Sequence, residues 1–185
     1  MSDDVPATVT SSRRVYKGPI LEVHLDRVRL PNGQVADLEI VRHPGAAAVV
    51  PLHADGRVRL IRQYRYAAAG FILEVPAGKL DPGEGPEACA LREIQEEAGL
   101  RAGRLHDLGF ILTTPGFTDE RIHLFVATAL EPVPATPEED EIITTLDLPL
   151  ESTLDLIARG AITDGKTLCA LMRTEQELRA GRLQP

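Results

Sequence analysis

Apolar residues recur at every second or third position in the first part of the chain, a pattern typical of short strands. Between residues 13 and 42 these positions are Val15, Ile20, Val23, Leu25, Val28, Leu30, Val35, Leu38 and Ile40. The Pro31-Asn32-Gly33 sequence among them is a strong turn signal. This segment is therefore predicted to form antiparallel strands, which end at His43-Pro44-Gly45.

The rest of the chain mixes strand and helix patterns. A second hairpin is expected around Ala54-Asp55-Gly56, between apolar runs at residues 46–52 and 57–64. Further strands are expected over residues 71–75, 105–112, 121–130 and 142–148, and helices over residues 86–98, 150–158 and 166–180. Residues 131–140 are proline-rich and acidic, which predicts a loop. Strands mixed with a few helices predict a layered α/β or α+β domain.

The break at His43-Pro44-Gly45 divides the chain into unequal parts. Residues 1–12 are polar and begin with acidic residues, so they are expected to form a disordered tail. Residues 13–43 are predicted to be a small N-terminal β unit, and residues 44–185 the main domain. The β unit is short for a sheet that is stable by itself.

Composition narrows the class of protein. A chain of 185 residues that is 43% hydrophobic can bury one good core, and its net charge of −8 argues against general nucleic-acid binding. Cys89 and Cys169 lack metal-ligand spacing, so free thiols in a reducing cytoplasm are expected. No run of about eighteen apolar residues occurs, so no membrane span is predicted.

The most informative chemistry is a cluster of acids on one predicted helix. Glu93, Glu96 and Glu97 share a helical face, because residues three and four apart are neighbours on a helix. A glycine-rich loop that carries Glu84 precedes the helix. Carboxylates crowded in this way are explained if divalent cations lie between them. The alternative is a solvated acidic face, which is common on glutamate-rich helices.

The wider spacing favours the cation site. Gly78, Glu84, the pair Arg92-Glu93, the pair Glu96-Glu97 and Gly99 stand in the pattern G-x5-E-x7-RE-(aliphatic)-x-EE-x-G-(aliphatic). The chain therefore resembles the Nudix hydrolases. This resemblance implies an α/β/α sandwich around a mixed sheet, and hydrolysis of a nucleoside diphosphate linked to another group, with Mg²⁺ or Mn²⁺.

The resemblance also implies roles for particular residues. Glu93 and Glu97 would be the principal metal ligands, and Glu96 a further ligand or the residue that orients a metal-bound water. The Ala77 carbonyl would coordinate as well. Arg92 would hold the carboxylates in place, and Glu84 would brace the loop or complete the outer shell.

Segments outside this motif are similar to the ADP-ribose pyrophosphatase subfamily. They are VYKGPILEV, RQYRYA, LEVPAG, EEDEI and PGFTDE, whose Pro115 lies fifteen residues after Leu100. The resemblance implies cleavage of ADP-ribose to AMP and ribose 5-phosphate by a homodimer whose N-terminal β units are exchanged. Other nucleoside diphosphate sugars or dinucleotides remain alternative substrates, and a non-catalytic ADP-ribose sensor is a further alternative. The chain has no Trp and only 4% aromatic residues, which weakens the expectation of adenine stacking.

Candidate substrate-binding residues follow from the same resemblance. Arg65 would grip the diphosphate, although an exposed charge at a strand end is equally consistent with the sequence. Glu74 would bond to ribose or adenine, or would brace Arg65. Ile20 and Glu39 would face the base. The alternative for Ile20 is a core residue, and the alternative for Glu39 is an exposed strand carboxylate. Phe117 of PGFTDE completes this set.

The attacking water needs a base or an orienting acid. The acidic run at residues 138–141 is normally a solvated loop, but the subfamily places a glutamate here for that purpose. Glu141 is the first choice because it directly precedes a predicted strand, and Glu139 is the reserve.

Overall fold

The computed structural model describes residues 6–185 and divides them into two compact units. The first unit runs to Pro44 and includes Leu112–Arg121, and the second comprises Gly45–Ile111 and Ile122–Pro185. The first boundary agrees with the break at His43-Pro44-Gly45. The inclusion of residues 112–121 in the first unit was not expected from the sequence. Residues 1–5 of the expected tail lie outside the described residues.

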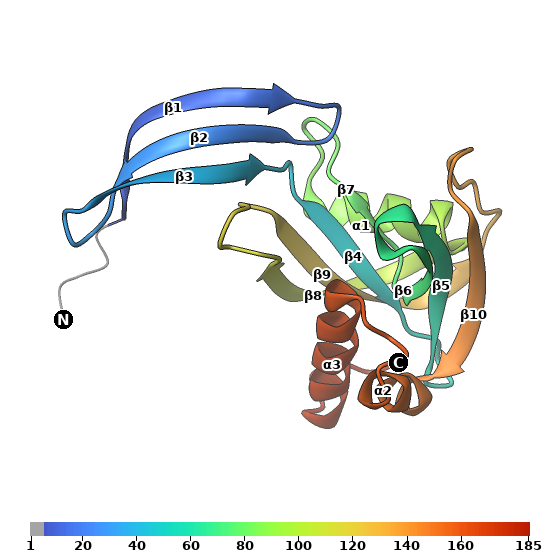
Figure 1. Cartoon of the computed structure of the whole chain (residues 1–185). Helices are drawn as coiled ribbons and strands as arrows, with labels where there is room; N and C mark the ends of the chain where they lie inside the picture. The colour runs from blue at the N-terminus through green and yellow to red at the C-terminus, as the bar shows by residue number, and fades with distance from the viewer. Residues whose placement is uncertain (1–5) are drawn as a thin grey trace. The chain divides into compact units, whose positions relative to one another are not determined.

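The first unit is a three-stranded antiparallel sheet in the order β1-β2-β3 (Figure 1). Its strands are β1 (Thr8–Lys17), β2 (Glu22–Arg29) and β3 (Val35–Arg42). The turn between β2 and β3 uses Gly33 at a φ of 84°, a left-handed conformation that glycine adopts without steric cost. The loop at residues 112–121 joins this unit because the Val41 N–H donates to the Phe117 carbonyl over 2.7 Å.

The expectation of a disordered tail through residue 12 is wrong for residues 8–12, because β1 begins at Thr8. Thr8 pairs with Arg29, and Ser12 pairs with Asp26. The Ser12 hydroxyl donates to the Asp26 carboxylate over 2.5 Å. Polar composition suggested a tail, but β-branched and hydroxyl side chains also suit an exposed strand whose backbone groups are paired.

A buried charge holds the first unit together in place of a large apolar core. The Asp26 side chain is only 2% exposed and accepts a hydrogen bond from Arg42 Nη2 over 2.6 Å. Arg42 also bonds to Asp119, whose carboxylate accepts from the His43 N–H. This network ties β2, β3 and the loop at residues 112–121 to one another.

The second unit is built around a mixed four-stranded sheet in the order β7-β4-β9-β8. The central strand β4 (Ala46–Pro51) pairs antiparallel with β7 (Ala77–Lys79) and parallel with β9 (Arg121–Pro132). Strand β8 (Leu100–Leu112) lies at the edge. The mixed sheet agrees with the fold class implied by the sequence.

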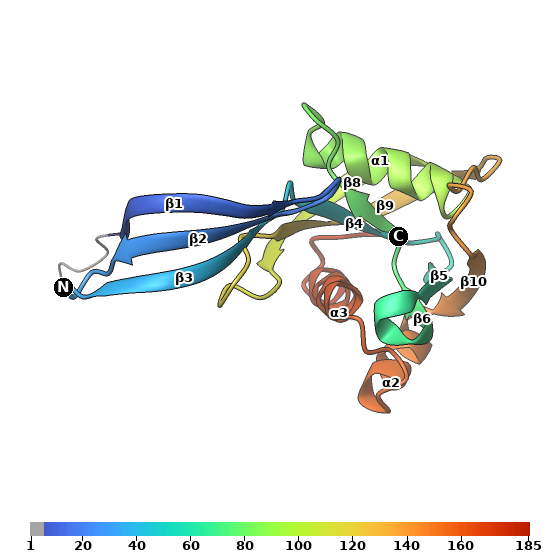
Figure 2. The same cartoon turned by 45° about the horizontal axis from the view of Figure 1, so that its top comes forward.

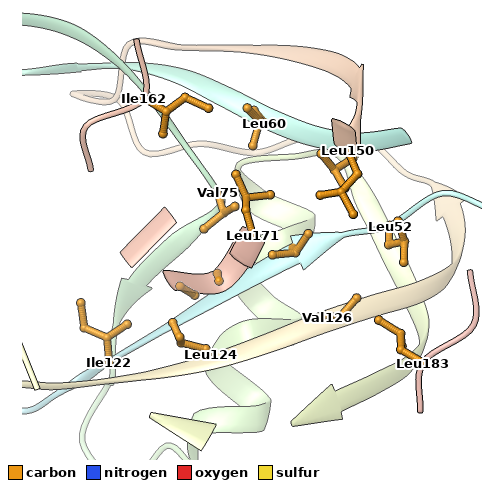
Figure 3. Close-up of a cluster of buried hydrophobic side chains, with 14 of the residues drawn as sticks. Leu52, Leu60, Val75, Ile122, Leu124, Val126, Leu150, Ile162, Leu171 and Leu183 are labelled. Carbon is orange, nitrogen blue, oxygen red and sulfur yellow. The ribbon is translucent and has the colours of Figure 1, made fainter. Parts of the chain in front are cut away.

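The alternation of side chains along β4 creates two cores. Ala48 and Val50 face a cluster with Leu171 of α3 (Gly165–Arg179), whereas Ala47 and Val49 face a cluster with α1 (Pro86–Glu96). Figure 2 shows these helices on opposite sides of the sheet, and Figure 3 shows the first cluster. Because β4 is buried on both faces, its sequence is a continuous apolar run, as expected for a central strand. The arrangement is an α/β/α sandwich.

A second, three-stranded sheet in the order β10-β5-β6 completes this unit. It contains β5 (Arg57–Arg65), β6 (Gly70–Glu74) and β10 (Ile143–Pro149), with a short 3₁₀ turn at Tyr66–Ala68 and helix α2 at Leu150–Ala158. The turn expected around Ala54-Asp55-Gly56 forms, because Leu52 makes an antiparallel bridge with Val58 and the His53 N–H donates to the Arg57 carbonyl over 2.8 Å. The pairing does not continue into a ladder between β4 and β5. Both edges of β4 are occupied by β7 and β9, so β5 pairs elsewhere.

The helix that carries the acidic motif has clear limits. Pro86 stands at its first turn, where no N–H is required, and the chain leaves it through Gly99 at a φ of 62°. Arg59 of β5 donates to the Ala98 carbonyl over 3.0 Å and pairs with Asp147 of β10 through two bonds. The C-terminal end of the helix is thus fastened to the second sheet. No helix within residues 6–185 has the length and apolar character needed to cross a membrane.

Candidate active site

Two of the motif acids are buried against the loop that precedes the helix. Glu97 is only 2% exposed, and its Oε2 accepts a hydrogen bond from the Ala77 N–H over 2.8 Å. Glu93 is also buried, and its carboxylate lies directly over Gly78. A Cβ at residue 78 would stand 1.7 Å from Glu93 Oε1, so the glycine is required for this approach. Residues 77–78 and the helix therefore hold two carboxylates in a confined space.

Burial makes these two acids difficult to ionise. Desolvation, together with the charges of Glu93 and Glu141, raises the pKa of Glu97 to about 8, against an ordinary value of 4.5. Desolvation also raises the pKa of Glu93, and the Arg92 charge offsets part of this effect. A cation between the two carboxylates would stabilise the ionised forms that burial disfavours.

Arg92 organises the remaining acids of the motif. Its Nη1 donates to Glu93 over 2.6 Å and to Glu96 over 2.9 Å, while Nε and Nη2 each reach Glu84 over 2.9 Å. The bonds from Arg92 lower the pKa of Glu84 to about 2, and Glu84 also accepts from the Asp81 N–H. Arg92 and Glu84 thus make the bracing contacts expected from the sequence. Their influence on catalysis stays a prediction.

The acids fit a divalent cation chemically. Within residues 6–185, no three His, Cys, Asp or Glu side chains are gathered in metal-ligating geometry. What the chain supplies is two buried carboxylates, Glu93 and Glu97, beside the backbone of Ala77. Hard oxygen donors of this kind suit Mg²⁺ or Mn²⁺.

Arg65 is the last residue of β5, and its partner Glu74 lies three residues before Ala77. Its Nε donates to Glu74 Oε1 over 2.7 Å and its Nη2 to Glu74 Oε2 over 3.1 Å. The Arg65 charge lowers the pKa of Glu97, so the guanidinium lies within electrostatic range of the buried acid. The Arg65 side chain is 39% exposed and Glu74 only 1% exposed. Of the two alternatives for Glu74, the structure shows the brace for Arg65.

The acids of residues 138–141 differ in their burial and in their influence on Glu93 and Glu97. The charge of Glu141 raises the pKa of both Glu93 and Glu97, so Glu141 lies within electrostatic range of these acids. Glu141 is partly buried, and its Oε2 accepts from the Glu138 N–H over 2.9 Å. Glu139 is exposed in a turn. The geometry therefore favours Glu141 over Glu139 as the acid nearest to the site.

The residues expected to bind the base all belong to the first unit. Ile20 is exposed in the turn between β1 and β2, and Glu39 stands on β3 opposite Leu25. Phe117 is exposed in the loop that is bound to Val41. The alternative that Ile20 is a core residue is wrong within the chain as described, since about half of its surface is exposed. Binding of a base by these residues stays a prediction.

Two residues near Arg65 were missed in the sequence. Lys166, in the first turn of α3, donates to Glu74 and bonds to Asp164 over 3.0 Å. Gln63 is buried two residues before Arg65, and its Oε1 has no hydrogen-bond partner in the part of the chain that the structure describes. An unpaired buried amide oxygen on the Arg65 side of β5 can accept a bond from a water or a ligand. Asp164 could have been recognised as the N-cap of this helix, but no local pattern predicts that Lys166 bonds to Glu74.

Comparison with known proteins agrees with this geometry. The NUDIX domain model matches residues 41–171, and the nucleoside diphosphate sugar hydrolase N-terminal domain matches residues 8–41. An ADP-ribose pyrophosphatase of Bacillus subtilis (strain 168) is 37% identical over 163 residues, which cover 87% of this chain and 88% of that protein. A methanol dehydrogenase activator of Bacillus methanolicus is 40% identical over 162 residues, or 86% of this chain and 88% of that protein.

A solved structure gives the same result for the fold. The crystal structure of an ADP compounds hydrolase superposes with a TM-score of 0.82 at 25% sequence identity, covering 96% of this chain and 97% of that one. The family model spans most of the chain, including the β7–α1 motif that holds Glu93 and Glu97. By its sequence, its sandwich fold and its buried acids, the chain belongs to the Nudix hydrolase family.

Proposed function

We propose that this chain hydrolyses the diphosphate of ADP-ribose, giving AMP and ribose 5-phosphate. The observation that carries the proposal is that Arg65 and the buried acids meet on one short segment of the second unit. Arg65 bonds to Glu74, and three residues later the Ala77 N–H bonds to Glu97, beside Glu93 over Gly78. A diphosphate needs cationic partners, and its hydrolysis needs an activated water, so both requirements are met in one place. The relative named as an ADP-ribose pyrophosphatase supports the choice of substrate.

The cofactor in this proposal is Mg²⁺, for which Mn²⁺ can substitute. Glu93, Glu97 and the Ala77 carbonyl would hold it, because they border the confined space at residues 77–78. Glu96, which shares Arg92 Nη1 with Glu93, would be a further ligand. When bound, such ions lower the pKa of a coordinated water and neutralise phosphate oxygens. Arg92 keeps Glu93 and Glu96 in position for this role.

The other residues act on the substrate and the water. Arg65 grips the diphosphate, and Glu74 fixes the orientation of Arg65 through two hydrogen bonds. Glu141 orients the attacking water or accepts its proton, because it is partly buried and lies within electrostatic range of Glu93 and Glu97. Glu139 would take this role only if the loop at residues 138–141 moved.

We also propose that the chain forms a homodimer in which the first unit is covered by a second copy. All ten residues of β1 are exposed, and a three-stranded sheet normally needs a face packed against another element. Val9 and Leu38 lie on the same side of this sheet, where β1 and β3 flank β2, and both are exposed. In the dimer, Ile20, Glu39 and Phe117 would contact the adenine. Light scattering that gave a monomer mass would contradict this arrangement.

The Gly78→Ala variant tests the close approach of Glu93. The added methyl would overlap the Glu93 carboxylate, so the acid must move away from residue 78. We expect the Mg²⁺ concentration for half-maximal activity to rise about 10-fold or more. The free energy of unfolding should fall by about 1–3 kcal/mol.

Gly85→Ala is the matched control for this variant. Residue 85 lies in the loop between β7 and α1 at a negative φ, and a Cβ there would meet no atom within 4 Å. Its Mg²⁺ requirement should stay close to that of the wild type. Equal Mg²⁺ requirements for Gly78→Ala and the wild type would show that Glu93 does not hold the cation.

Substrate profiling tests the proposed function directly. ADP-ribose, GDP-mannose, NADH and diadenosine polyphosphates are incubated with Mg²⁺, and the products are identified after reaction in ¹⁸O-labelled water. We expect AMP and ribose 5-phosphate from ADP-ribose with the highest kcat/KM. Preference for a guanine sugar would overturn the assignment of ADP-ribose as substrate. Tight binding of ADP-ribose without cleavage would favour the alternative of a non-catalytic sensor.

The compartment proposed for the protein is a reducing cytoplasm, which the free thiols Cys89 and Cys169 support.

A further inference from the structure

The first turn of α3 is fastened to the strand that carries Glu74. Asp164 is the N-cap residue, and its carboxylate accepts a hydrogen bond from the Thr167 N–H over 3.0 Å. The Thr167 hydroxyl, which is fully buried, donates to Asp164 over 2.6 Å and accepts from the Val75 N–H over 2.9 Å. The helix start is therefore bonded to the backbone two residues before Ala77.

Lys166 extends from the same turn to the Glu74 carboxylate. Its Nζ donates to Glu74 Oε2 and to Asp164 Oδ2, and its side chain is only 11% exposed. A lysine held so far from water is normally explained by its charge partners. Here the partners are one carboxylate of its own turn and one that belongs to the diphosphate-binding side of the unit.

Glu74 is thus shared by two cations. Arg65 Nε donates to Glu74 Oε1 and Arg65 Nη2 donates to Glu74 Oε2. Lys166 of α3 also donates to Glu74 Oε2. Because Glu74 is almost completely buried, its charge must be compensated within the protein. Without Lys166, Arg65 alone would compensate Glu74 and would be drawn towards it. In that position its guanidinium would be less available to another anion.

We propose that Lys166 is a positioning residue for the reaction, which sets the orientation of Arg65 towards the diphosphate through the shared Glu74 carboxylate. The inference rests on the proposed function, since it assigns Arg65 to the substrate. It adds to the site a cation from α3, outside the β7–α1 motif. Lys166 itself does not touch Glu93 or Glu97, so the cation requirement should be independent of it.

A double-mutant cycle separates this role from a purely structural ion pair. The variants Lys166→Met and Arg65→Lys are compared with the double variant by kcat/KM for ADP-ribose. Lys166→Met alone should lower kcat/KM about 10- to 100-fold, because a misplaced positioning group has an effect of this size. In the Arg65→Lys background the same change should lower it less than about 3-fold, since the two residues act as one unit.

Further variants keep the test decisive if Lys166→Met folds poorly. Lys166→Arg retains a cation for Glu74 and should recover kcat/KM to within about 5-fold of the wild type. The control Arg179→Met removes an exposed cation from the last turn of the same helix and should leave kcat/KM unchanged. Half-maximal Mg²⁺ concentrations should agree between the wild type and Lys166→Met.

The outcomes distinguish the inference from the proposed function. One outcome is that the wild type cleaves ADP-ribose while the kcat/KM losses of Lys166→Met and Arg65→Lys multiply in the double variant. In that case Lys166 does not act through Arg65, so the inference is overturned and the proposed function stands. A Lys166→Arg protein as impaired as Lys166→Met would also overturn it. If the wild type cleaves none of the diphosphates offered, the proposed function fails and the inference fails with it.

Discussion

The Glu97→Gln protein is expected to lose at least about 10³-fold in kcat on ADP-ribose in saturating Mg²⁺, because a charged oxygen ligand is replaced by a neutral amide. Glutamine has nearly the same shape and can still accept the bond from the Ala77 N–H. The loss should therefore come from the cation site and not from a change in the fold. Steady-state kinetics over a range of Mg²⁺ concentrations measures it.

The same variant should be more stable than the wild type when cations are removed. The folded pKa of Glu97 is about 8 against an ordinary 4.5, so the folded protein retains a proton that the unfolded chain loses between these values. In EDTA, the contribution of Glu97 to the free energy of unfolding of the wild type therefore falls as pH rises from 4.5 to 8. Glutamine does not ionise, so the Glu97→Gln protein does not lose this contribution. The Tm difference should grow across this window, at roughly 2–4 °C per kcal/mol for a chain of this size.

Glu87→Gln provides the matched control on the same helix. Glu87 is exposed in the first turn of α1, so its loss should change neither kcat nor the Mg²⁺ requirement. A Glu97→Gln protein with near-normal turnover in Mg²⁺ would show that the cation site is assigned to the wrong residues. A lower Tm for Glu97→Gln in EDTA at pH 8 would show that Glu97 is not a strained buried acid.

The Arg65→Lys protein should lose about 10²-fold or more in kcat/KM for ADP-ribose, because an ammonium cannot replace the planar guanidinium that bonds to Glu74 and to phosphate at once. Arg65 already uses Nε and Nη2 on Glu74, and in the proposal its Nη1 donates to the phosphate. Lysine can make only the contact to Glu74 or the contact to phosphate. The effect should fall mainly on diphosphate substrates and less on the affinity for Mg²⁺.

Arg62→Lys is the control for this substitution. Arg62 lies on the same strand but is exposed, and its guanidinium stacks 3.9 Å from the centre of the Phe71 ring. It should affect kcat/KM by less than about 3-fold, as expected of a surface cation away from the reacting groups. Similar losses for Arg62→Lys and Arg65→Lys would contradict the assignment of Arg65 to the diphosphate.

Local patterns in the sequence predicted the helix and its acids well. Pro86 and Gly99 marked the two ends of α1 because each residue has a backbone preference that the sequence reveals directly. The spacing of Glu93 and Glu97 placed both on one face, which is a property of any helix. The contacts of Arg92 with neighbouring acids also lie within a few turns of chain.

Long-range features could not be predicted in the same way. The pairing of β4 with β7 and β9 limits the expected hairpin with β5 to its turn and one bridge, and no local signal encodes that competition. Lys166 lies 92 residues from Glu74 and looked like an ordinary helix residue. The strand at Thr8 depends on pairing with Arg29 and not on its own polar composition.

The central claim is that the buried pair Glu93 and Glu97 stays ionised because a divalent cation compensates it. The most direct test is calorimetric titration of the wild type with Mg²⁺ and Mn²⁺ at pH 7, in buffers of different ionisation enthalpy. We predict cation binding with release of up to about one proton, because the pKa of Glu97 is about 8 before binding. Proton release should decline above pH 8, and Glu97→Gln should show neither signal. Absence of cation uptake by the wild type, even with ADP-ribose or AMP present, would contradict the account.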